Sequence, residues 1–110
     1  MTFDEYQAAA RRTQNPRLSM QERKAHALHG LASEVGEIHA LYQKVYQGHM
    51  LSSDALIKEL GDELWFIAEL CDVYELSLDD VAQVNIIKLK ARYPDGFRTE
   101  RSINRAEGDI

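Results

Sequence analysis

Four carboxylates in this 110-residue sequence have the type and spacing of a metal site. Two similar segments, residues 31–37 and 56–62, each carry a pair of acids three positions apart, and these acids are Glu34, Glu37, Glu59 and Asp62. Residues three apart on a helix are neighbours on its surface, so each pair can converge on one ligand. Because the set offers only oxygen ligands, without cysteine or a helical Glu-x-x-His, it favours Mg²⁺ or Mn²⁺ over zinc or di-iron.

The position of the acids on their helices separates a metal site from an ordinary charged surface. Most Glu-x-x-Glu pairs lie on solvated helix faces, and a single pair would be interpreted that way. At about 100° per residue, however, Glu34 and Glu59 fall within the apolar sectors of their helices, and Glu37 lies at the edge of its sector. If these sectors face each other, the carboxylates meet partly out of water and repel one another unless a cation neutralises them.

Three further residues lie close to the acid pairs in sequence. Gly36 and Gly61 each lie inside a predicted helix, where glycine costs on the order of 1 kcal/mol relative to alanine. A close approach of another group to the backbone would explain both glycines. Glu63 is either a fifth, auxiliary carboxylate or the partner of a nearby lysine or arginine, and the sequence leaves both interpretations open.

A polar stripe further along the chain suits an anion. Asn85, Lys88 and Arg92 follow one another at steps of three and four, on the same helix side as several apolar residues. Charged groups on an inward face are costly unless they reach an anion, so the stripe suits the phosphates of a ligand. The alternative, equally compatible with the sequence, is that Lys88 and Arg92 pair with acids of the preceding helices or reach water.

Helices must position all of these residues, because apolar spacings of three and four recur along the chain and strand-like alternation is never sustained. Capping boxes, a C-terminal glycine and a proline predict four helices. The first runs from Thr2 to before Asn15, the second from Ser19 to about Gln47, the third follows a connection over residues 49–53 and reaches Tyr74, and the fourth runs from Ser77 to before Pro94. We therefore predict an all-α, four-helix bundle-like fold, with a long antiparallel hairpin and two shorter helices. Residues 1–97 form the predicted helical catalytic domain, and residues 98–110 a polar C-terminal tail.

Length and composition exclude several classes of protein. A formal net charge of −5 argues against a nucleic-acid surface, although a cation can still bridge an acidic protein to a small phosphorylated ligand. Cys71, the only cysteine, has no disulfide partner and is interpreted as a reduced core residue. No apolar run approaches the roughly 20 residues of a membrane span, and the N-terminus lacks signal-peptide features, so we expect a cytoplasmic protein without a membrane partner.

With both acid pairs and the polar stripe considered together, the chain resembles the MazG-like nucleoside triphosphate pyrophosphohydrolases of the all-α NTP pyrophosphatase superfamily. The family pattern of Glu-x-x-Glu, a spacer and Glu-x-x-Asp is met by the four acids. Its downstream Asn-x-x-Lys and Arg-Tyr-Pro-like segments are similar to residues 85–88 and 92–97. The resemblance covers most of the chain. We expect a compact single-domain form of the family, without the second domain of its longer members.

The resemblance implies hydrolysis of an NTP or dNTP between the α and β phosphates, as in house-cleaning of the nucleotide pool. It implies that the four acids hold Mg²⁺, with Mn²⁺ as a substitute, and that a water molecule attacks the α-phosphorus. Glu37 or Glu34 is the candidate proton acceptor, and Asn85, Lys88 and Arg92 would bind phosphate oxygens. It also implies a homodimer or homotetramer, in agreement with a predicted long helix that its short neighbours cannot cover.

The main alternative is a non-catalytic helical module that regulates a partner or senses nucleotides. A regulatory module would explain the helical apolar spacing, but not the repeated acid pattern or the polar stripe. The presence of all four acids argues against a nucleotide sensor that does not hydrolyse its ligand. The sequence does not specify the base. Aromatic side chains at helical spacing are more often core than base-stacking residues, which applies to Phe3, Tyr6, His39, Tyr42, Tyr46 and Trp65.

Overall fold

The computed structural model describes residues 1–110 and consists of two compact units, Met1–Leu78 and Asp79–Ile110, which are described in turn. The chain forms five helices and no β-strand, which confirms the predicted all-α class. The helices are α1 (Phe3–Arg11), α2 (Met20–Val45), α3 (Ser53–Val73), α4 (Leu78–Arg92) and α5 (Thr99–Ile103). None of them combines the length and the apolar character that crossing a membrane requires.

Both predicted capping boxes are present and fix where α1 and α2 begin. The Thr2 hydroxyl accepts a hydrogen bond from the Glu5 backbone N–H at 3.1 Å, and the Glu5 carboxylate accepts one from the Thr2 N–H at 3.3 Å. Ser19 and Glu22 form the same reciprocal pair at 3.1 and 2.9 Å. Each box satisfies two N–H groups that a helix start would otherwise leave without a partner.

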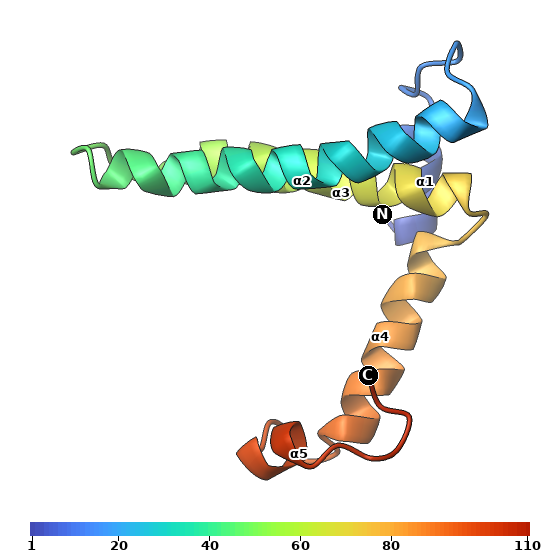
Figure 1. The fold of residues 1–110 in the computed structure, drawn as a ribbon, viewed down its shortest axis with the longest axis vertical. Coiled ribbons are helices and arrows are strands. Elements are labelled where there is room, and N and C mark those ends of the chain that lie inside the picture. The colour runs from blue at the N-terminus through green and yellow to red at the C-terminus, as the bar shows by residue number, and fades with distance from the viewer. The chain divides into compact units, whose positions relative to one another are not determined.

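Helices α2 and α3 lie side by side as an antiparallel hairpin (Figure 1). Gly48 reverses the chain after α2 with a φ of +94°, a conformation that glycine adopts at little cost. The Ser52 hydroxyl then caps α3 by accepting a hydrogen bond from the Ala55 N–H at 3.2 Å. Within the hairpin the Phe66 ring lies against Gly30, where an added Cβ would be 2.2 Å from Phe66 Cε1. Gly30 therefore allows the ring to pack directly on the α2 backbone.

The hydrophobic core of the first unit includes the segment where α1 packs against α3. Ala68, Cys71 and Leu78 form a buried cluster, with Tyr6, Ala10, Leu64 and Ile67 partly buried around it. Cys71 is buried and free, as the sequence predicted, and burial raises the pKa of its thiol. This core anchors the α1 end of the hairpin.

Asp72 joins α1 to α3 through several hydrogen bonds. Its carboxylate accepts from Gln7 at 2.8 Å, from Arg11 at 2.9 and 3.2 Å, and from Gln14 at 2.8 Å. Burial would raise the pKa of Asp72, but the bonds from Arg11 and Gln7 and the positive charge of Arg11 outweigh it and lower the pKa. Gln7 also accepts from the backbone N–H of Leu78 at 2.7 Å, so its buried amide fixes the start of α4.

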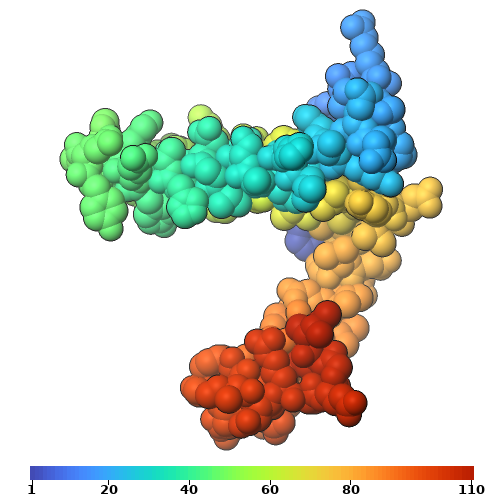
Figure 2. Space-filling view, in the orientation of Figure 1, coloured from blue at the N-terminus to red at the C-terminus, as the bar shows by residue number.

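The second unit contains most of α4, then α5 and the residues that follow it. Figure 2 shows residues beyond α5 gathered around the end of α4. The segment predicted to be a polar tail, residues 98–110, contains helix α5 and pairs with α4. Asp109 accepts two hydrogen bonds from Arg92, at 2.7 and 2.6 Å.

Candidate metal centre

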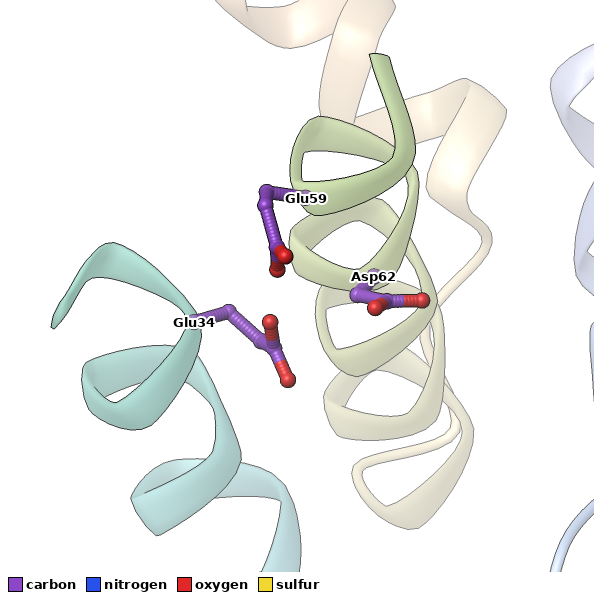
Figure 3. Close-up of side chains that lie close together, drawn as sticks. All are labelled: Glu34, Glu59 and Asp62. Carbon is purple, nitrogen blue, oxygen red and sulfur yellow. The ribbon is translucent and has the colours of Figure 1, made fainter. Parts of the chain in front are cut away.

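The hairpin brings together three of the four acids that the sequence identified. Glu59 and Asp62 lie one turn apart on α3, and Glu34 points toward them from α2 (Figure 3). One carboxylate oxygen from each residue lies within 4.8 Å of the other two. Three convergent carboxylate oxygens form a ligand set that suits a hard cation such as Mg²⁺. We call these three residues the acid cluster.

The acid cluster is electrostatically unsatisfied by protein groups alone. Glu34 Oε2 is buried and has no hydrogen-bond partner. Burial raises the pKa of the Glu34 carboxyl group, and a hydrogen bond shared with Glu59 and the negative charges of the neighbouring acids raise it further. A divalent cation would supply the missing partner and remove the repulsion, so the residues fit such an ion.

Glu37 lies outside the acid cluster. Its side chain is exposed, whereas Glu34, one turn before it on α2, is half-buried. Its negative charge still contributes to the raised pKa of Glu34, although it is the smallest of the causes. The fourth acid therefore acts near the cluster without being one of its convergent ligands in this structure.

Two other acids on α3 differ sharply in their surroundings. Glu63 has one buried carboxylate oxygen, Oε2, without a hydrogen-bond partner, and no lysine or arginine forms a salt bridge with it. The sequence left open whether Glu63 pairs with a basic residue, and the structure shows no such pair. Glu69 is only 2% exposed and contacts His26 Nδ1 at 2.9 Å through its Oε2. Glu69 and His26 form a structural contact between α3 and α2.

The family comparison covers the segment that contains this site. Residues 22–97 match the MazG nucleotide pyrophosphohydrolase domain, which is more than half of the chain. The chain belongs to this family. The match includes the acid cluster, Glu37 and the polar residues of α4, and it confirms the resemblance that the acid pairs indicated.

A curated relative comes from a virus. Gene 37 protein of Mycobacterium phage L5 is 33% identical to this MazG-family chain over an alignment of 72 residues, and the match covers 61% of this chain and 63% of the relative. The chain thus spans less than two thirds of the length of that protein. No solved structure matches the chain.

The α4 residues of this MazG domain are placed in the second unit. Asn85 and Lys88 are exposed, whereas Arg92 is half-buried and binds Asp109. Of the inward stripe that the sequence predicted, only Arg92 is sheltered from solvent in the single chain. Its partner, Asp109, comes from the segment predicted to be a tail.

Tyr6 is a neighbour of the acid cluster that spacing alone did not identify as one. Its ring packs beside the buried residues of α3, and burial followed by the negative charge of Asp62 raises the pKa of its phenol. The contact crosses from α1 to α3, so no local motif in the sequence points to it.

The glycines of the repeated segments have open surroundings. A Cβ added at Gly36 or Gly61 would meet nothing within 4 Å, so neither helix is closely packed at its glycine. The close approach predicted at these two positions is therefore not made within the chain. It occurs instead at Gly30, against Phe66.

Proposed function

We propose that this chain is a Mg²⁺-dependent pyrophosphohydrolase that cleaves an NTP or dNTP between its α and β phosphates, releasing a monophosphate and pyrophosphate. The observation that carries this proposal is the convergence of three carboxylate oxygens within 4.8 Å, in a segment that matches the MazG domain. The unpartnered, buried Oε2 of Glu34 supports a cation at this position. The biological role we propose is removal of unwanted nucleotides from the pool.

The acid cluster would hold the metal, and Glu37 would complete the set from the adjoining turn of α2. When bound, Mg²⁺ would neutralise part of the triphosphate charge and lower the pKa of a water molecule at the site. The carboxylate that takes the proton of the attacking water is Glu34 or Glu37, and Glu37 lies outside the cluster.

Residues of α4 would bind the phosphates. The Lys88 ammonium offers a compact charge with rotatable donors, and the Arg92 guanidinium offers a planar fork that matches two phosphate oxygens. Asn85, one turn before Lys88, offers an amide N–H donor to the same group. Such donors stabilise the negative charge that develops on the departing pyrophosphate.

We also propose that the chain works as a homodimer or homotetramer. The hairpin exposes apolar side chains that a monomer would leave in water, including Leu28 (60% exposed), Ile57 (66%) and Leu60 (51%). Exposed apolar surface of this extent on two packed helices favours association with a second copy.

Product analysis with a panel of nucleotides tests the proposed function. NTPs and dNTPs incubated with the protein and Mg²⁺ should yield monophosphate and pyrophosphate, and EDTA should abolish the reaction. Diphosphate and orthophosphate as products would contradict the proposed bond. Nucleotide binding without turnover would favour the nucleotide-sensing alternative, and the preferred member of the panel would identify the base.

A further inference from the structure

Asp109 and Arg92 form a bidentate salt bridge. Arg92 Nε donates to Asp109 Oδ2 at 2.7 Å and Arg92 Nη2 donates to Asp109 Oδ1 at 2.6 Å, while Nη2 also donates to the backbone carbonyl of Ile110 at 3.0 Å. The two side chains are only 10% and 14% exposed. The Nε–Nη2 edge of the guanidinium, which could otherwise bind two phosphate oxygens, is therefore occupied.

Other cations surround the same carboxylate. Hydrogen bonds from Arg92 lower the pKa of Asp109, burial opposes them, and the positive charges of Arg92, Arg105 and Lys88 lower it further. The cavity at this place has a volume of about 290 Å³, and its charged lining includes Lys88, Arg92, Arg101, Arg105, Glu107 and Asp109. Within the second unit, α4 and the tail thus form a mainly cationic pocket with one carboxylate bound in it.

We propose that Asp109 is an internal competitor, whose carboxylate occupies a phosphate-binding pocket formed by Lys88, Arg92 and Arg105 until a phosphorylated ligand displaces it. A carboxylate and a phosphate present the same pair of oxygens to an arginine fork, so the two compete for Arg92. The ligand class is a phosphoanhydride, either free pyrophosphate or the phosphate chain of a nucleotide. Binding of a nucleotide in this pocket during hydrolysis rests on the proposed function.

The competition has a direct consequence for affinity. Only molecules in which Asp109 has left Arg92 can bind the ligand through the full fork, so apparent affinity falls by the fraction of molecules in that open state. The bound carboxylate also re-forms its contact when pyrophosphate leaves. Asp109 thereby weakens binding and speeds product release.

Calorimetric titration with inorganic pyrophosphate, in EDTA so that the acid cluster binds no metal, tests the pocket without any need for turnover. Asp109→Asn should bind pyrophosphate at least about threefold more tightly than wild type, because the competing charge is lost. Glu100→Gln removes an exposed tail carboxylate that contacts only Arg98, at 3.8 Å, and should leave the affinity unchanged. Adding Arg92→Ala to Asp109→Asn should abolish the gain. Titration with a nucleoside triphosphate distinguishes the two ligand sources.

Unchanged or weaker pyrophosphate binding by Asp109→Asn, with helicity retained, would overturn the proposal. Hydrogen exchange of the wild-type chain gives an independent test: saturating pyrophosphate should speed exchange in residues 107–110, which Asp109 anchors, and unaltered exchange there would also overturn the proposal. If no nucleotide is hydrolysed but Asp109→Asn still tightens pyrophosphate binding, the proposed function fails and the pocket stands. If nucleotides are hydrolysed and Asp109→Asn shows no gain, only the pocket fails.

Discussion

At the scale of single residues, Asp62 is the most accessible test of the acid cluster, because it is exposed and its replacement leaves the hairpin packing intact. Asp62→Asn should lower kcat by at least about 100-fold, since it removes a charged metal ligand from the site. Steady-state kinetics with Mg²⁺ measures the effect, and circular dichroism checks that the helices remain. Asp54→Asn, on the first turn of the same helix, is the matched control and should keep wild-type turnover.

If Asp62→Asn and Glu59→Gln both retained full activity, the metal assignment would be wrong. Loss of activity in Asp54→Asn as well would show that the effect of Asp62→Asn is not specific to the cluster.

Glu34 gives a prediction about pH. Its pKa in the folded protein is raised above the ordinary value of 4.5, so the folded state holds this proton to a higher pH than the unfolded state does. The free energy of unfolding of the metal-free protein should therefore fall as pH rises from about 4.5 through the raised pKa. Glu34→Gln should remove this loss, and in EDTA at neutral pH it should melt at a higher temperature than wild type.

Addition of Mg²⁺ should reverse that order, because the wild-type protein gains binding energy that Glu34→Gln lacks. Thermal melts across pH, with EDTA and with Mg²⁺, provide both comparisons. An identical pH profile for the two proteins in EDTA would contradict the electrostatic account of the cluster.

Much of the acid cluster was predictable from sequence because its residues repeat at a helical spacing. The position of Glu37 outside the cluster was not, since its place at the edge of the apolar sector is decided by how α2 rotates against α3. The Asp72 contacts were also missed, because Gln7 and Arg11 precede Asp72 by more than 60 positions and no local pattern links them. The partner of Arg92 was missed for a similar reason.

At the scale of helices, alanine substitution of two glycines in α2 should change the stability of the protein in opposite directions. Gly30→Ala should destabilise the protein by about 1–3 kcal/mol, because the new methyl group overlaps the Phe66 ring, which itself packs on Trp65. Gly36→Ala should stabilise it by about 0.5–1 kcal/mol, because the site is open and alanine favours the helix. Urea denaturation compares the two variants, and equal effects would contradict the described packing.

Helix boundaries followed closely from local chemistry. The two capping boxes, Gly48 and Pro94 placed α1, α2 and the end of α4 correctly within a few residues, because each of these signals acts through the adjacent backbone. Helix α5 was not predicted. It has five residues and no side-chain cap, so neither an apolar period nor a start signal marks it.

At the scale of the whole molecule, the exposed apolar residues of the hairpin predict self-association. Size-exclusion chromatography with light scattering should give a mass at least twice the 12.6 kDa of the chain. Ile57→Asp, which places a charge on this surface, should shift the mass toward the monomer while the helices remain. A wild-type mass of one chain at micromolar concentration would contradict the proposed oligomer.

The acid cluster should direct water to the α-phosphorus of a nucleoside triphosphate. Hydrolysis in ¹⁸O-labelled water, with Mg²⁺ and analysis of both products by mass spectrometry, identifies the phosphorus that is attacked. We expect one labelled oxygen in the nucleoside monophosphate and none in the pyrophosphate. Label in the pyrophosphate, or orthophosphate as the labelled product, would contradict it.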